Sequence, residues 1–221
     1  MVLAREGVVD ALMKGSLHTD ELMSAVVRNH TGLRGPRRLS HAFVFDAPRY
    51  PKLLALADCV VNIAPDLRAK RDILFNAVEL LRDALAIEQP RVGIVAAVET
   101  VNPLIQATVD AAALVAEAAN GAFGAAIVEG PLGFDNAVSA AAARTKGIDS
   151  RVAGEADLLL VPDLNAGNLL YKSFVYLGGA ECAGVVLGAR VPIVLTSRAD
   201  SLTARVASAA LASLAARPVP R

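Results

Sequence analysis

The sequence predicts an α/β protein with a mainly parallel sheet and an antiparallel edge. Short apolar runs typical of buried strands alternate with helical segments through most of the 221 residues. Hydrophobic residues make up 54% of the chain and Trp is absent, which fits buried strands covered by alanine-rich helices. In two places, near 39–61 and 182–195, one strand-like run directly follows another. An antiparallel edge, or a strand that crosses between two lobes, would explain both places.

The expected helices begin at capping residues or at proline. Residues 5–14 are expected to form the first helix, which Gly15 ends. Thr19 supplies an N-cap oxygen for the second, and Asp20 and Glu21 follow at its positive end. Pro103 opens a helix that runs to about residue 119. Further helices are expected at 66–85, at 134–144, from about 166, and at 200–216.

The expected strands are short apolar runs bounded by turn residues. Residues 156–162 (ADLLLVP) form the clearest of them, because the run is almost entirely apolar, as in a strand buried on both faces. The others are expected at 40–45, 53–61, 91–98, 122–128, 182–187 and 191–195.

Charge and cysteine content exclude several classes of protein. Lys and Arg together number 22, as do Asp and Glu, so a broad basic face for nucleic acid is not expected. The basic run at residues 34–38 is interpreted as a solvated loop. Cys59 and Cys182 have no metal-site spacing and are interpreted as reduced core thiols. No run is long enough to span a bilayer, and the N-terminus has no apolar signal core, so a soluble, cytoplasmic protein is expected.

Several catalytic motifs are absent from the sequence. It contains no P-loop, no dinucleotide fingerprint after a strand and no nucleophile elbow. His18, His30 and His41 lack metal-ligand spacing, and each is interpreted as a capping or surface residue. His18 is the most interesting of the three, because it directly precedes the expected N-cap.

Residues 192–201 (PIVLTSRADS) form the best candidate site. A buried strand ends at Leu195 and a helix begins a few residues later, and ligands in parallel α/β sheets gather beyond the carboxyl ends of strands. Free amides at the helix N-terminus favour an anion there. Hydroxyl donors and a planar guanidinium suit a phosphate or an acyl phosphate. The residues concerned are Thr196, Ser197, Arg198 and Ser201, with Asp200 as a proton acceptor or helix cap. The structural alternative is an ordinary capped helix with a surface arginine.

Two more loops that follow expected strands carry polar side chains. In residues 161–168, Asp163 can cap a helix, and Asn168 and Lys172 share one helix face at i and i+4. Residues 129–136 end in Asp135 and Asn136. Each loop alone is also consistent with ordinary capping and packing. Together the three loops indicate a shared cleft.

These segments resemble the phosphate acetyltransferase/phosphate butyryltransferase family along nearly the whole chain. The branch that the chain resembles is the one fused behind an enoyl-CoA hydratase-like domain in bifunctional proteins. Several long motifs occur in the family's order, which is a specific signal. They are residues 11–15 (ALMKG), 18–22 (HTDEL), 129–137 (EGPLGFDNA), 152–158 (VAGEADL), 161–168 (VPDLNAGN) and 195–201 (LTSRADS).

The resemblance implies a fold and a reaction. The fold has two lobes around a cleft, similar to isocitrate and isopropylmalate dehydrogenases. One lobe would comprise residues 1–38 plus 187–221, and the other residues 39–186. The reaction moves a short acyl group between CoA and inorganic phosphate by direct transfer in a ternary complex. A homodimer is implied, with no metal and no tightly bound cofactor, no nucleic-acid partner and no membrane. CoA and acyl-CoA are substrates.

The resemblance also assigns roles to residues. Ser197 would hydrogen-bond the CoA sulfur or the reacting carbonyl, and Arg198 would hold the phosphoryl group. The family's proposed base lies where this chain has Ala204, so Asp200 is the substitute. The substrate-binding set implied is Thr196, Ser201, Asp163, Asn168, Lys172, Asp135, Asn136, His18 and Thr19.

Two further departures from the family pattern support a second hypothesis. A phosphate-binding arginine of the family is replaced by Ser24, although Arg28 or Arg34 could compensate. Family members also carry more strands and helices upstream of the ALMKG motif. The second hypothesis is therefore a non-catalytic module that binds acyl-CoA or mediates oligomerisation. An unrelated α/β binding protein is the third. The sequence leaves the choice between acetyl and butyryl open.

Overall fold

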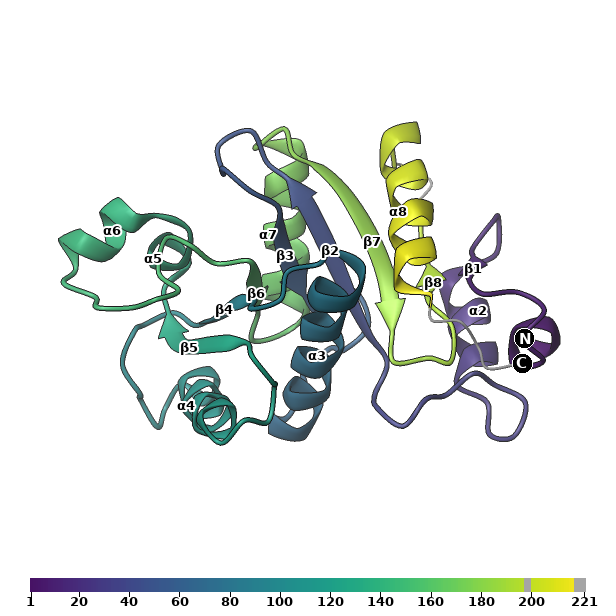
Figure 1. Ribbon diagram of the computed structural model, residues 1–221, viewed down its shortest axis with the longest axis horizontal. Coiled ribbons are helices and arrows are strands. Elements are labelled where there is room, and N and C mark those ends of the chain that lie inside the picture. Colours follow the sequence, from purple (N-terminus) through teal and green to yellow (C-terminus); the bar gives the residue numbers. More distant parts are fainter. Residues whose placement is uncertain (197–199, 217–221) are drawn as a thin grey trace.

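The computed structural model describes residues 1–196 and 200–216 (Figure 1). In this part of the chain eight strands form one sheet in the order β1-β8-β7-β2-β3-β6-β4-β5. The strands are β1 (Leu12–Met13), β2 (Ser40–Asp46), β3 (Leu54–Ala57), β4 (Arg91–Val95), β5 (Ile127–Leu132), β6 (Leu158–Leu160), β7 (Glu181–Leu187) and β8 (Ile193–Val194).

The sheet is mixed, as the sequence predicted, with parallel pairing over most of its width. Strands β3, β6, β4 and β5 are mutually parallel, and β1 is parallel to β8. Antiparallel pairs join β2 to β3 and β7 to β8, at the two places where strand follows strand, and also join β2 to β7. The carboxyl ends of β1 and β8 therefore lie at one edge of the sheet, and those of β3, β6, β4 and β5 lie at the opposite edge.

Helices lie on both faces of the sheet (Figure 1). They are α1 (Val2–Arg5), α2 (Thr19–Val26), α3 (Leu67–Glu79), α4 (Gln106–Ala119), α5 (Phe134–Val138), α6 (Ala140–Thr145), α7 (Leu164–Tyr176) and α8 (Leu202–Ala215), and a π-helical turn, η1 (Leu80–Ala84), extends α3. In the described part of the chain no helix is both long and apolar enough to cross a membrane.

The expected helix over 5–14 was wrong. The helix α1 ends at Arg5, and Leu12 and Met13 form the edge strand β1 instead. The backbone N–H of Leu12 donates to the oxygen of Pro192 at 3.0 Å, and the N–H of Lys14 donates to that of Val194 at 2.9 Å. Pairing with β8 therefore overrides the local preference of this segment for helix.

Two other boundaries also differ from the prediction. The strand expected at 122–128 begins only at Ile127, because Gly121 and Gly124 take positive φ values of 80° and 65° in a turn before it. The helix expected at 134–144 divides at Ser139, whose side chain accepts a hydrogen bond from the N–H of Ala142 at 3.2 Å and begins α6.

The core has three parts. Helices α3, α4 and α8 pack on one face of the sheet, around residues such as Leu158, Val185 and Leu211. Helices α5 and α7 cover the other face next to Phe45 and Leu159. The third part joins α1 and α2 to β7 and β8, and its buried members are Ala4, Val26, Leu33, Leu39, Val186, Val191 and Ile193. The division into lobes at residues 38 and 187 remains a prediction.

His41 is a core residue, so its interpretation as a capping or surface histidine was wrong. It lies on β2 in the interior of the sheet, is 1% exposed, and has its ring centroid 4.4 Å from that of Phe43. Its Nδ1 atom has no hydrogen-bond partner among the described residues. Burial lowers the pKa of His41 from 6.5 to about 4, although the nearby Asp58 carboxylate acts in the opposite direction.

We predict that His41 destabilises the fold in acid. Below pH 6.5 the unfolded chain binds a proton at this residue, whereas the folded protein does not until about pH 4. The free energy of unfolding should therefore fall by about 3 kcal/mol between these pH values on account of His41 alone. Urea unfolding of the wild type and His41→Gln across this range measures the difference. His30→Gln, at an exposed histidine, is the control. Equal pH dependence in wild type and His41→Gln would contradict the prediction.

Candidate functional site

The candidate site begins where β1 and β8 end. These two strands are parallel neighbours, so the segments that follow them, which begin at residues 14 and 195, leave the sheet at the same edge. The structure thereby brings the predicted residues His18 and Thr19 to the edge that holds Thr196, Asp200 and Ser201. The predicted catalytic residues Ser197 and Arg198 lie outside the described residues. We call the described group the β8-end site.

Lys14 places a cation at this edge, and the sequence reasoning did not single it out as a site residue. It directly follows β1, and its N–H is bonded to the oxygen of Val194 at the end of β8. Its Nζ donates to the backbone oxygen of Leu17 at 3.3 Å. A signal was available, because Lys14 belongs to the ALMKG motif and immediately follows the apolar pair Leu12–Met13.

Two helix N-termini flank the β8-end site. His18, not Thr19 as expected, is the N-cap of α2, and its N–H donates to Glu21 at 3.3 Å. Ser201 is the N-cap of α8, and its Oγ accepts from the N–H of Ala204 at 3.0 Å. The Ser201 side chain therefore fixes the start of α8. Both helix dipoles present their positive ends toward this edge, which favours an anionic ligand.

Helix α7 packs over β2 and β7 beside the site. The Tyr171 ring stacks on Phe43 with a centroid distance of 4.2 Å and an interplanar angle of 5°. Opposite Phe43 in the sheet is Gly184, where a Cβ atom would come within 2.7 Å of the Phe43 ring. Glycine at position 184 therefore makes room for the ring that supports Tyr171.

Electrostatics place Asp200 near this aromatic pair. Burial is the main cause that raises the pKa of Tyr171 to about 12, and the negative charge of Asp200 is the next cause. Burial likewise raises the pKa of Cys182 to about 11, with Asp200 as the second cause. The Asp200 carboxylate, directly before the N-cap of α8, therefore lies close enough to α7 and to the start of β7 to act on both.

Asn168 and Lys172 share the α7 face that the sequence predicted. Asn168 is half-buried and Lys172 is exposed. Tyr171 lies three residues after Asn168 and so projects from a similar direction. Helical spacing from Asn168 is the signal in the sequence that could have identified Tyr171 as a site residue.

Asp163 is a structural cap at the other edge of the sheet. It is the N-cap of α7, and its Oδ1 accepts from the N–H of Ala166 at 2.9 Å. It also lines a cavity of about 510 Å³ whose polar lining includes Lys70 and Asp110, which form a buried ion pair at 2.7 Å. Because β6 runs opposite to β8, this cavity lies at the edge away from the β8-end site.

Asp135 and Asn136 also lie far from the β8-end site. They follow β5, the last strand of the sheet order at the end opposite β1. Lys146 pairs with Asp135 at 3.0 Å and with Glu99 at 2.7 Å, and this pairing lowers the pKa of both carboxyls. Asn136 is buried and donates to Glu99. The single cleft expected from three loops is thus divided between two edges of the sheet.

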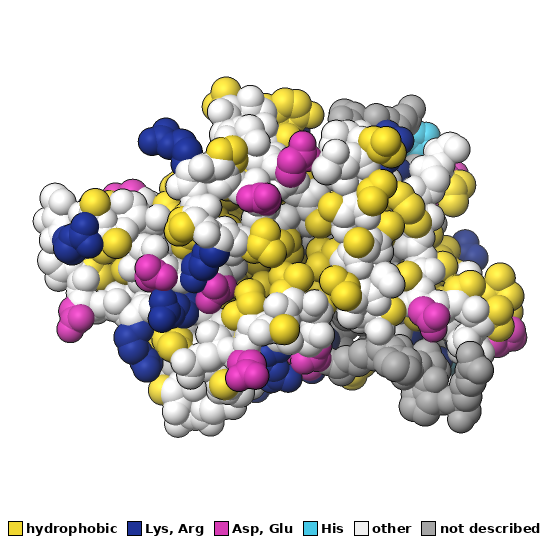
Figure 2. All heavy atoms as spheres, turned by 45° about the horizontal axis from the view of Figure 1, so that its top comes forward, with side chains coloured by type: hydrophobic (Ala, Val, Ile, Leu, Met, Phe, Trp, Pro, Cys, Tyr) yellow, Lys and Arg dark blue, Asp and Glu magenta, His cyan; other side chains and the backbone are white. Residues whose placement is uncertain are grey.

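Apolar and charged surfaces are separated on one face of the molecule. Figure 2 shows hydrophobic side chains across the middle of this face, whereas charged side chains of both signs gather mainly toward the left. Exposed large hydrophobic residues occur on α7, directly after it, and on α8. They include Leu169, Tyr176, Leu177, Leu202 and Val206. Within the described residues no group of three or more His, Cys, Asp and Glu could hold a metal ion.

Comparisons with known proteins give a consistent result. The profile of the family described as phosphate acetyl/butaryl transferase matches residues 1–213. A phosphate acetyltransferase from Rhizobium meliloti is 55% identical over 214 residues, covering 97% of this chain and 67% of that protein. A probable phosphate butyryltransferase from Bacillus subtilis is 49% identical, covering 92% of this chain and 68% of that protein. The chain spans 60–71% of the length of the curated relatives that it matches.

Solved structures agree with this result. A branched-chain phosphotransacylase from Enterococcus faecalis superposes with a TM-score of 0.89 at 33% identity, covering 97% of this chain and 76% of that one. A 4-hydroxythreonine-4-phosphate dehydrogenase from Klebsiella pneumoniae shares the fold, with a TM-score of 0.54 at 14% identity over 98% of this chain and 67% of that one. The predicted likeness to a dehydrogenase-type fold is therefore confirmed. The match over residues 1–213 and the identities of 49–55% show that the chain belongs to the phosphate acetyl/butaryl transferase family.

Proposed function

We propose that the protein transfers a short acyl group between CoA and inorganic phosphate, directly and within a ternary complex. Family membership supports this proposal, as do the names of the relatives, which include phosphate acetyltransferases and phosphate butyryltransferases. The structural observation that carries it is the convergence at the β8-end site. Two helix N-termini, the Lys14 cation and the Asp200 carboxylate lie at the edge where β1 and β8 end, and Ser197 and Arg198 fall in the sequence between Thr196 and Asp200.

The reaction needs charge stabilisation and one proton acceptor. Attack of the CoA thiol on an acyl phosphate requires removal of the thiol proton and relief of negative charge on the phosphoryl group. We propose that Arg198 holds the phosphoryl oxygens through its planar fork and that Ser197 donates to the CoA sulfur or the reacting carbonyl. Positioning of the two substrates side by side supplies the rest of the rate enhancement.

We propose Asp200 as the base. The place where the family's base is expected holds Ala204 here, which is 8% exposed and packed within α8. Asp200 lies one residue before the N-cap of α8 and acts electrostatically on Tyr171 and Cys182. Its carboxylate is therefore at the correct edge of the sheet to accept a proton from a thiol bound beside residues 196–198.

The position of each remaining site residue decides whether we propose it as a substrate contact or as a structural cap. We propose that Thr196, His18, Thr19, Asn168 and Lys172 contact the substrates, because the β8-end site and α7 bring them to the same side. Ser201 and Asp163 act by holding the starts of α8 and α7. Asp135 and Asn136 remain predicted binding residues at the opposite edge of the sheet.

The proposal also covers the oligomeric state, the cofactors and the cellular location of the protein. We propose a homodimer, since Leu202, Val206 and Leu214 form an exposed apolar stripe at intervals of four and eight residues on α8. CoA and its thioesters are substrates, and we propose that no metal or tightly bound cofactor takes part. We also propose that the protein is cytoplasmic.

Arg198→Gln is expected to lower kcat/KM for acyl transfer by about 10²- to 10³-fold, because it removes a charged donor to the transferring group. A thiol-release assay with phosphate and acetyl-, propionyl- or butyryl-CoA measures the effect. Arg49→Gln removes an equal charge at an exposed position and should change the rate less than twofold. CoA binding without turnover by the folded wild type would instead support the non-catalytic module.

Asp200→Asn is expected to lower kcat for the reaction of CoA with acetyl phosphate about 10²- to 10⁴-fold while changing the KM for acetyl phosphate little, because a base acts in the transition state more than in binding. Asp200→Glu should recover part of the rate. Steady-state kinetics with CoA and acetyl phosphate, the direction in which the thiol must lose its proton, measure this. An unchanged kcat in Asp200→Asn would assign the base to another residue. Asp149→Asn, at an exposed carboxylate, is the control.

A further inference from the structure

A cavity of about 410 Å³ at the opposite end of α2 from the β8-end site has an unusual lining. Its walls are Arg5, Arg28, Asn29, His30, Gly32, Arg34 and Arg190. Four guanidinium groups and one imidazole thus surround a space that no carboxylate of the described residues lines. We call it the arginine pocket. In a chain with 22 acidic and 22 basic residues, such a separation of charge requires an explanation.

Backbone hydrogen bonds fix the three segments that form the arginine pocket. The loop after α2 closes through the N–H of Leu33, which donates to the oxygen of Val26 at 2.8 Å. The N–H of Arg190 in turn donates to the oxygen of Leu33 at 2.8 Å. Arg5 reaches the same loop, where its guanidinium donates to the oxygen of His30 at 3.0 Å. The arginines are therefore held together by the fold.

The loop also depends on a glycine. The N–H of Gly32 donates to the oxygen of Arg28 at 3.0 Å, and a Cβ atom at position 32 would collide with the backbone oxygens of Val26 and Arg28. Leu33 is completely buried in the third part of the core. Any other residue at position 32 would open the turn that brings Arg28 and Arg34 to the same cavity.

The guanidinium groups of this pocket are not neutralised by any carboxylate in the described part of the chain. Elsewhere, Arg37, Arg71, Arg82, Arg91 and Arg151 each form an ion pair with a carboxylate. Among residues 1–196 and 200–216, no carboxylate oxygen lies within 4.0 Å of the side-chain nitrogens of the four pocket arginines. Arg34 donates to the neutral side chain of Asn29 at 3.3 Å. The like charges therefore repel each other unless an anion is present.

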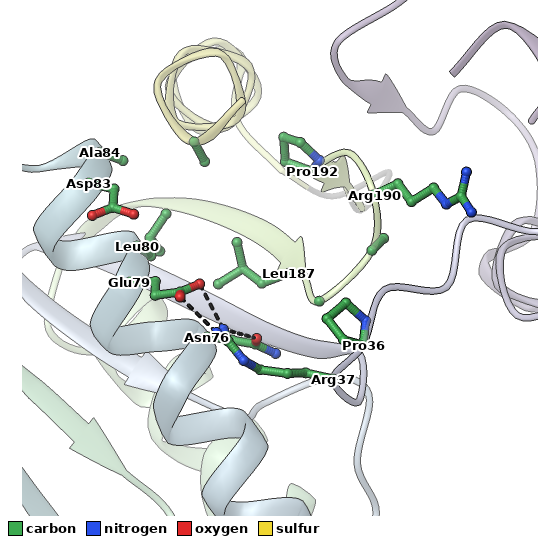
Figure 3. Close-up of a pocket in the computed structure, with 13 residues that line it drawn as sticks. Pro36, Arg37, Asn76, Glu79, Leu80, Asp83, Ala84, Leu187, Arg190 and Pro192 are labelled. Atoms are coloured by element: carbon green, nitrogen blue, oxygen red, sulfur yellow. Dashed lines mark hydrogen bonds and ion pairs between the residues drawn. The ribbon is translucent and has the colours of Figure 1, made fainter. Parts of the chain in front are cut away.

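In a neighbouring cavity, by contrast, an arginine is paired with a carboxylate. This cavity, of about 210 Å³, is lined by Arg37, Glu79, Asp83 and Arg190, among others (Figure 3). Both nitrogens of the Arg37 fork donate to the Glu79 carboxylate at 2.7 Å, and these bonds raise the pKa of Arg37. In Figure 3 the Arg190 side chain points away from Glu79 and Asp83. Its charge is thus directed to the side of the arginine pocket.

We propose that the arginine pocket binds the diphosphate group of a small molecule, at a place distinct from the acyl-transfer phosphate. Arginine forks match phosphate oxygens in pairs, and several of them suit a group with more than one phosphate. The pocket lies beside Arg190, before β8 begins, and after the carboxyl end of α2. The β8-end site lies beyond the other ends of the same two elements. The diphosphate could belong to a free nucleotide or to the nucleotide end of CoA.

Titration calorimetry with inorganic pyrophosphate, at a constant ionic strength of about 0.1 M to screen diffuse charge, tests the proposal. Arg28→Gln with Arg34→Gln should weaken binding by at least about tenfold, because each change removes a charge-assisted contact. Arg28 makes no hydrogen bond or ion pair through its side chain in the described part of the chain, so Arg28→Gln alone should leave folding intact. Thermal unfolding verifies this.

Matched controls separate the pocket from general surface charge. Arg49→Gln with Arg68→Gln changes the net charge equally at exposed positions outside the pocket and should alter the affinity less than twofold. Loss of affinity in both double variants, equal affinity of wild type and the pocket variant, or no pyrophosphate binding by the wild type would each overturn the proposal.

Displacement of bound pyrophosphate by CoA, dephospho-CoA or ADP identifies which molecule supplies the diphosphate. If CoA and dephospho-CoA displace pyrophosphate more strongly than ADP does, the pocket holds the nucleotide end of CoA. If ADP displaces it as well as CoA does, the pocket holds a free nucleotide. Both results support the diphosphate site, and neither requires the enzyme to be active, so failure of the proposed acyl transfer would be recognised separately.

Discussion

The direction of β2 is the constraint on which the rest of the structure depends. It lies between β3 and β7 and is antiparallel to both, so β7 is parallel to β3, and β8 and β1 point the other way. This sends the loops after β6 and β5 to one edge of the sheet and the loops after β1 and β8 to the other. Two helix starts, a lysine and Asp200 consequently meet at the β8-end site, while Asp135 and Asp163 lie at the opposite edge.

The packing of α7 over β2 and β7 sets the position of α7 relative to Asp200. Phe43 is held flat against Tyr171 because its cross-strand neighbour is Gly184, and α7 is thereby placed where the charge of Asp200 reaches it. Gly167 likewise permits close packing at the start of α7, where a Cβ atom would come within 2.6 Å of the backbone oxygen of Asp58. Small residues at these two positions therefore set the distance between α7 and the sheet. Beside Phe43, the buried His41 has no hydrogen-bond partner for its Nδ1 atom among the described residues.

Local patterns predicted the fold class and most of the elements, because strands such as Leu158–Leu160 are continuous apolar runs and helices such as α7 begin at capping side chains. The family motifs, read in order, predicted the fold type and the family. Strand direction is not encoded in local periodicity, so the division of the three loops between two edges could not be foreseen. Leu12–Met13 became a strand only through pairing with β8. The arginine pocket joins residues 5, 28–34 and 190, which come together only in the folded chain.

Hydrogen–deuterium exchange with and without CoA and phosphate is the most direct test of the central claim, that catalysis is built at the edge where β1 and β8 end. Ligands are expected to slow exchange together in three segments, residues 14–22, 168–172 and 195–202, because the proposed substrate contacts lie in them. Residues 133–138 should be unaffected by comparison. Protection confined to residues 129–136 and 161–163, with no change at 195–202, would contradict the account and place the site at the opposite edge of the sheet.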